Sequence, residues 1–147
     1  MEGFEYGNDG PSLILAAVDG SVTSLRAGAY AAGLARRQRS ELVVITVTTT
    51  PALSAMAADA VTVLTQSAQE LGQELQQWAK QEMHRLELQA RFVLVHGDPY
   101  LEIVRCADEL RADAVVVGAS TKAGHRLVGS LAGRLVKAGK WPVTVVP

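Results

Sequence analysis

Two short polar segments of this sequence carry residue types suited to ligand binding, and each follows an apolar run. The first segment is Asp19-Gly20-Ser21. The second extends from Gly118 to Ser130 and interleaves glycines with basic side chains: Gly118, Lys122, Gly124, His125, Arg126 and Gly129. Glycines let backbone N–H groups approach an anion closely, and a helix expected to begin at Gly129-Ser130 would offer further free N–H groups to phosphate. The second segment therefore indicates an anion site.

Asp19 offers a different chemistry, because a carboxylate only accepts hydrogen bonds and suits sugar hydroxyls or a metal ion better than phosphate. Structural alternatives stay open for both segments. Asp19 can cap a helix, and Gly118 and Gly124 can serve as turn residues. Gly129-Ser130 can cap the helix that follows. Asp19 and His125 are the only candidate catalytic groups near the two segments, so the sequence does not indicate a dedicated enzyme.

The elements that must position these segments alternate along the chain. Continuous apolar runs predict strands at residues 12–18, 42–47, 90–95, 114–117 and 141–146. Amphipathic or capped segments predict helices at about 23–39, 63–88, 99–110 and 130–138, the third of them begun by Asp98 and Pro99. Gly72 is mildly unfavourable within the second helix, the Ala-rich residues 52–62 receive no assignment, and residues 118–128 are predicted as a polar loop.

Strict alternation of strands and helices predicts an α/β fold with a five-stranded parallel sheet and right-handed crossovers. We expect a three-layer, doubly wound sandwich with strand order 3-2-1-4-5, formed as one domain by residues 12–147 after a flexible lead at 1–11. In such a sheet ligands bind outside the carboxyl ends of the strands, where the chain order reverses. Here the reversal lies between strands one and four, which end at Asp19 and Gly118.

Composition sets limits on partners and compartment. The 147 residues are 48% apolar and carry a net charge of −1, so no nucleic-acid partner is indicated. The start of the chain lacks the features of a signal peptide, and no apolar run approaches the roughly 20 residues that span a bilayer. The single cysteine, Cys106, is expected in the core and favours a reducing compartment. A cytoplasmic protein without a membrane partner is predicted.

Two other classes with this type of sheet are excluded by residue pattern. A phospho-receiver domain needs a cluster of acids at the ends of the first and third strands, and Asp19 stands without one. A dinucleotide-binding fold needs G-x-G-x-x-G after the first strand, which Asp19-Gly20-Ser21-Val22-Thr23 does not supply.

Five segments in order resemble the universal stress protein family: Ile14–Ser21, His96–Pro99, Ala112–Ser120, Leu127–Ser130 and Trp141–Pro147. The resemblance covers the chain from about Leu13 to its end. It implies the fold of the adenine nucleotide alpha hydrolase-like group and a role as a cytoplasmic stress-response regulator. It also implies a homodimer, formed by pairing of the last strands at Val143–Val146, whose exposed sheet edge suits that contact.

The resemblance further implies an adenine nucleotide, with ATP as the leading candidate, and Mg²⁺ only if a triphosphate is bound. Members bind ATP through a loop written G-x2-G-x9-G-S/T, and they contact the nucleoside through an aspartate and the end of the second strand. Carried over, the expected binding residues are Ala17, Asp19, Val47, Val117, Gly118, Thr121, Gly129, Ser130 and Leu131. Slow ATP hydrolysis is the most that is expected as enzyme activity.

This sequence departs from the family loop at two points. Thr121 occupies the position of the second glycine, and ten residues separate Gly118 from Gly129 where the family pattern has twelve. Three functions therefore stay open: a nucleotide-responsive regulatory dimer, a dimeric interaction module that binds an unidentified protein without a nucleotide, and an enzyme acting on a nucleotide.

Overall fold

Strands and helices alternate throughout the computed structural model, which describes residues 10–49, 58–120 and 128–147. The strands are β1 (Leu13–Ala17), β2 (Glu41–Thr48), β3 (Ala90–His96), β4 (Ala114–Gly118) and β5 (Val143–Val146). The helices are α1 (Val22–Gln38), α2 (Ala58–Arg85), α3 (Pro99–Leu110) and α4 (Ser130–Ala138). Within these residues, no helix is both long enough and apolar enough to cross a membrane.

The five strands form one sheet in the order β3-β2-β1-β4-β5, and every neighbouring pair is parallel. The predicted fold class and strand order are therefore confirmed. Leu15 of β1 lies opposite Val43 of β2 on one side and Val115 of β4 on the other. The central position of β1 places its carboxyl end, with Asp19 two residues beyond it, in the middle of one sheet edge.

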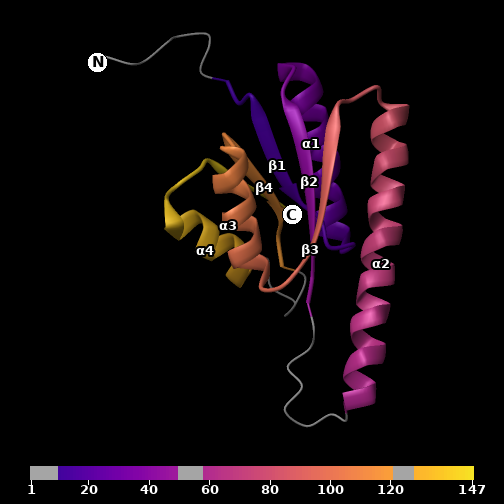
Figure 1. Cartoon of the computed structure of the whole chain (residues 1–147). Coiled ribbons are helices and arrows are strands. Elements are labelled where there is room, and N and C mark those ends of the chain that lie inside the picture. The colour runs from indigo at the N-terminus through magenta and orange to yellow at the C-terminus, as the bar shows by residue number, and fades with distance from the viewer. Residues whose placement is uncertain (1–9, 50–57, 121–127) are drawn as a thin grey trace.

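Helices cover both faces of the sheet, α1 and α2 on one side and α3 and α4 on the other (Figure 1). Side chains alternate between the two cores along each strand, so Leu15 packs toward α3 and α4 while Ile14 and Ala16 pack toward α1. Cys106 is 5% exposed and belongs to the core on the α3 side, as predicted. Burial raises the pKa of its thiol, which makes it a packing residue rather than a nucleophile.

The second helix differs from its predicted bounds of 63–88 at both ends. It begins at Ala58, within the Ala-rich stretch that received no assignment, and it ends at Arg85. Glu87 adopts a left-handed conformation with φ 52°, and the Leu88 N–H then donates to the Met83 carbonyl at 3.0 Å. This bond closes the helix end, so Leu88 starts the approach to β3 instead of continuing α2. Most of the predicted flexible lead, residues 1–9, lies outside the described residues.

Candidate functional site

A pocket of about 540 Å³ opens at the carboxyl ends of the central strands. Eight of the nine expected binding residues line it together: Ala17, Asp19, Val47, Val117, Gly118, Gly129, Ser130 and Leu131. The ninth, Thr121, lies outside the described residues, as do Lys122, Gly124, His125 and Arg126. The pocket thus occupies the switch between β1 and β4 that the topology predicts.

Asp19 is held in the loop between β1 and α1 by short-range hydrogen bonds. Its Oδ1 accepts from the Ser21 N–H at 2.9 Å, and its own N–H donates to Ser24 Oγ at 3.2 Å. Burial raises the pKa of Asp19, but hydrogen bonds from Ser21 and Ser24 outweigh this and hold the pKa below the usual range. The group that caps α1 is Ser21, whose side chain accepts from the Ser24 N–H. Asp19 therefore presents an ionised acceptor at the pocket.

Gly118 lies where β4 meets the first turn of α1. A Cβ added at this position would lie 2.6 Å from the Ser24 nitrogen and 2.6 Å from the Thr23 carbonyl carbon, and both atoms belong to the backbone. The Thr23 hydroxyl also donates to the Ala119 carbonyl at 2.6 Å, which ties the two segments together. Gly118 is thus required for a close approach of two backbones, a role that neither the turn nor the anion interpretation anticipated.

The start of α4 supplies donors suited to an anion. Gly129 precedes the helix with φ 25° and makes no side-chain cap, and the first helical bond runs from the Gly133 N–H to the Gly129 carbonyl at 3.0 Å. The N–H groups of residues 130–132 come before that bond, so no helical carbonyl accepts from them. Ser130, Leu131 and Ala132 all line the pocket. N–H groups without a helical acceptor and the helix dipole together favour phosphate at this position.

Helix α2 forms a wall of the pocket that the sequence analysis did not identify. Ala68, Leu71 and Gly72 line the cavity beside the end of β2. A Cβ at Gly72 would lie 2.9 Å from Thr48 Cγ2, so the glycine lets α2 approach β2 closely. Leu71 is 63% exposed although it is a large apolar residue. The signal that was available is Gly72 itself, an unfavourable residue in an otherwise regular amphipathic helix.

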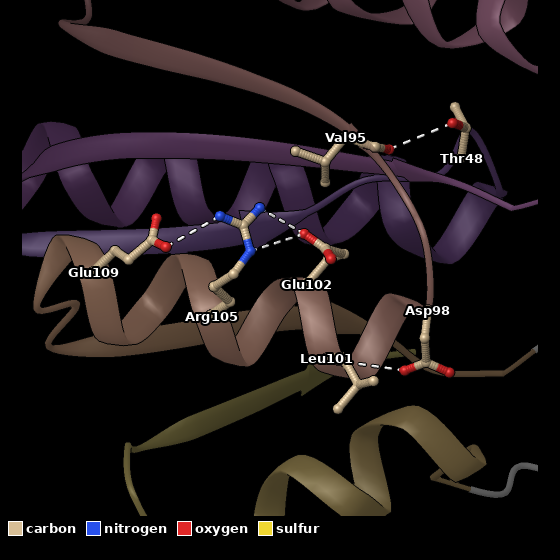
Figure 2. Close-up of polar contacts among 7 residues, drawn as sticks. All are labelled: Thr48, Val95, Asp98, Leu101, Glu102, Arg105 and Glu109. Carbon is tan, nitrogen blue, oxygen red and sulfur yellow. Dashed lines mark hydrogen bonds and ion pairs between the residues drawn. The ribbon is translucent and has the colours of Figure 1, made fainter.

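Helix α3, which covers the other face of the sheet from α2, completes the pocket: its Pro99 and Ile103 also line it. Asp98 caps this helix as predicted, accepting from the Leu101 N–H at 2.9 Å (Figure 2). Farther along α3, Arg105 pairs with both Glu102 and Glu109 (Figure 2). None of these three residues lines the pocket. These contacts fix the helix that supports the pocket rather than contribute ligand groups.

The residues that the structure describes contain no group of three His, Cys, Asp or Glu side chains able to hold a metal ion. Asp19 is the single carboxylate among the described residues that line the pocket. The pocket therefore combines one acceptor, a set of backbone donors at α4 and an apolar wall at α2, which together match a ligand with a hydroxyl-bearing middle, an anionic end and a flat apolar end.

Comparison with known proteins decides the family, because the model of the universal stress protein family matches residues 12–147. The chain belongs to the universal stress protein family. A relative from Methanocaldococcus jannaschii, universal stress protein MJ0531, is 30% identical over 136 residues, which is 90% of this chain and 80% of the relative.

Two solved structures of the family share the fold. A protein of the universal stress protein family from Burkholderia pseudomallei is 26% identical, with a TM-score of 0.76 over 96% of this chain and 98% of its own. A universal stress protein in complex with cAMP is 27% identical, with a TM-score of 0.70 over 94% of this chain and 98% of its own.

Proposed function

We propose that this universal stress protein binds an adenine nucleotide in the pocket between β1 and β4, with ATP as the leading candidate. The observation that carries the proposal is that eight residues chosen from scattered sequence positions line a single pocket. The family member in complex with cAMP supports an adenine nucleotide as the ligand class.

In this proposal, different residues of the pocket contact the ribose, the base and the phosphates of the nucleotide. Asp19, ionised and exposed, accepts from the ribose hydroxyls. The base lies beside the backbone of Val47, against Leu71 and Gly72 of α2. The phosphates lie at the start of α4, where the N–H groups of residues 130–132 and the Ser130 hydroxyl donate to them.

Mg²⁺ enters this proposal only with a triphosphate. Since the described part of the chain offers Asp19 alone as a carboxylate at the pocket, phosphate oxygens and water would supply most of the ligands of the ion. Among the described residues such a site has no dedicated protein cage, and slow hydrolysis is the most that we propose as activity.

Isothermal titration calorimetry with ATP, ADP, AMP and cAMP tests the proposal. We expect saturable binding of at least one of the four, and Asp19→Ala to weaken it about tenfold, the effect of removing a hydrogen bond to a charged group. Asp108→Ala is the matched control, because this carboxylate pairs with Lys140 at 2.8 Å and lies outside the pocket lining. Absence of heat with all four nucleotides at millimolar concentration would overturn the proposal.

We also propose that the protein acts as a cytoplasmic homodimer joined through β5, and that bound nucleotide changes what the dimer presents to a partner protein. β5 pairs with β4 on one side only, which leaves its other edge available for a second copy. A ligand shifts such a dimer only by its difference in affinity between two states, so binding must be measured before regulation is assigned.

One observation favours a second function, a dimeric interaction module without nucleotide. The loop that would enclose phosphates has Thr121 in place of a glycine and is two residues shorter than the family pattern. Two results together support this alternative over the first: a protein partner is captured equally well by wild type and Asp19→Ala, and calorimetry detects no nucleotide binding.

A further inference from the structure

A second cavity, of about 330 Å³, lies between α1 and α2, on the face of the sheet that these two helices cover. Val18 and Val44 form its floor, Ala29 and Gly33 of α1 form one wall, and Trp78 and Met83 of α2 form the other. The space exists because α1 presents small residues toward α2. A Cβ added at Gly33 would meet a single atom within 4 Å, Arg37 Nη1 at 3.7 Å, so this wall is open.

The lining of this cavity is almost entirely apolar. Among the lining residues within the described part of the chain, polar side-chain groups come only from Arg36, Glu82 and Arg85, apart from the indole N–H of Trp78. Trp78 is 48% exposed, so a large aromatic surface stands in water at the cavity wall. A volume near the lower end of the range for ligand pockets, roughly 300–1,000 Å³, suits a small apolar body.

The three charged side chains do not balance one another. Arg85 and Glu82 form an ion pair, with Arg85 Nη2 at 2.7 Å and Nε at 3.1 Å from the same Glu82 oxygen. Arg36 makes no hydrogen bond or ion pair to any residue in 10–49, 58–120 or 128–147. One exposed guanidinium therefore stands uncompensated at the rim of an apolar cavity, and a guanidinium is the side chain best shaped to bind a carboxylate.

We propose that this cavity binds a small amphipathic carboxylate of the medium-chain fatty acid type, with the chain against Trp78 and Met83 and the carboxylate at Arg36. The apolar chain gains by leaving water, and the head group stays at the solvent-exposed rim, where its charge keeps most of its hydration. The site is separate from the nucleotide proposal, because it uses none of the Asp19 or α4 groups; Val18 alone lines both pockets.

Tryptophan fluorescence provides a direct test. The chain has two tryptophans, and Trp141→Phe leaves Trp78 as the sole reporter at the cavity. Decanoate, kept below its micelle concentration, is expected to shift the Trp78 emission to the blue with a saturable dependence. Decanol, which has the same chain without the charge, is expected to bind about fivefold more weakly, the upper effect of an exposed ion pair. Acetate is expected to give no shift.

Variants in the Trp141→Phe background separate the two parts of the site. Arg36→Gln is expected to weaken decanoate about fivefold and leave decanol unchanged. Arg111→Gln, which changes an exposed arginine beyond the end of α3, is expected to change neither. Gly33→Leu is expected to abolish binding of both ligands by filling the cavity while the far-ultraviolet circular dichroism spectrum and melting temperature are retained, because leucine favours the helix more than glycine does.

Three results would overturn the proposal. The first is the absence of a saturable change in Trp78 emission with decanoate, and the second is an equal loss of affinity in Arg36→Gln and Arg111→Gln. The third is a Trp78 emission that depends on protein concentration without ligand, together with dissociation of a dimer by Gly33→Leu, since this would make the cavity an interface between two copies of the chain.

Discussion

Gly118 shows how a single residue couples the pocket to the fold. Because an added Cβ would lie 2.6 Å from two backbone atoms of α1, Gly118→Ala forces β4 and α1 apart. We expect a loss of about 1–3 kcal/mol in the free energy of unfolding, the usual effect of overpacking. Urea denaturation measures it. Gly133→Ala in α4 is the control, since a Cβ there meets nothing within 4 Å, and it is expected to stabilise by roughly 0.5–1 kcal/mol. Equal stability of Gly118→Ala and wild type would contradict the close approach.

Asp19 provides a prediction on pH. Its pKa is lowered in the folded protein, so its contribution to stability is present above the unfolded pKa of about 3.9 and is lost as the pH falls through the folded value. The side-chain carboxyl carbon of Asp19, followed by NMR, is expected to titrate below about 3.9. Ser21→Ala is expected to raise that midpoint, because the Ser21 hydroxyl helps to hold the charge. Ser130→Ala, elsewhere in the pocket, should leave it unchanged; a midpoint insensitive to Ser21 would refute the assignment.

For single residues, the sequence was sufficient to predict which residues line the pocket. It was not sufficient to predict the structural role of each of them. Asp19 and Gly129 could be identified because they follow an apolar run or precede a helix, positions visible in the pattern. The approach of Gly118 to Thr23 and Ser24 joins residues almost a hundred positions apart, and pattern analysis of one sequence contains no information on that distance. The α2 wall was missed for the same reason, because Gly72 meets Thr48 only in the folded chain.

At the scale of the element, the bounds of α3 and α4 match the prediction, and the largest error lies at the two ends of α2. α1, α2 and α3 are each followed by a non-glycine residue in the left-handed conformation, namely Arg39, Glu87 and Arg111. The next N–H then donates back to a carbonyl in the last turn: Ser40 to Ala35, Leu88 to Met83 and Ala112 to Ala107. Glycine is the usual signal for such an ending, and its absence at Glu87 explains why the predicted second helix ran to residue 88.

These endings carry strain that a substitution can relieve. Glu87 has φ 52° and makes no ion pair with any described residue. Glu87→Gly therefore relieves an unfavourable backbone conformation without breaking an ion pair. We expect the free energy of unfolding to rise by about 0.5–1 kcal/mol, less than the full cost of a left-handed residue because glycine also gains entropy in the unfolded chain. Thermal denaturation measures the change. Glu87→Ala is the matched control and should not raise the free energy of unfolding. If it raises this free energy as much as Glu87→Gly does, the effect comes from loss of the charge and not from the backbone conformation.

At the scale of the whole molecule, the class of architecture followed from the alternation of strands and helices together with the apolar character of the strands. Apolar runs such as Leu42–Val47 have no polar face, which requires helices on both sides of the sheet, and right-handed crossovers then leave few strand orders. The confirmed order places β5 at an edge. How two copies meet at that edge depends on a second chain, so the homodimer stays a prediction to be tested in solution.

The directions of the backbone N–H and C=O groups of β5 show which substitution can test this homodimer. Val115 N–H donates to the Pro142 carbonyl and Ala119 N–H donates to the Val146 carbonyl, so even-numbered residues of this segment face β4. On a parallel strand, both backbone groups of a residue point to the same side, and Val143 and Val145 therefore direct theirs to the open edge. Val145→Pro removes an outward N–H and no bond to β4, a substitution that edge strands tolerate.

We expect wild type to sediment as a dimer and Val145→Pro as a folded monomer. Val145→Thr keeps both the shape and the N–H and should stay dimeric. A wild type that sediments as a monomer at tens of micromolar, or a Val145→Pro variant that remains dimeric, would exclude pairing through β5.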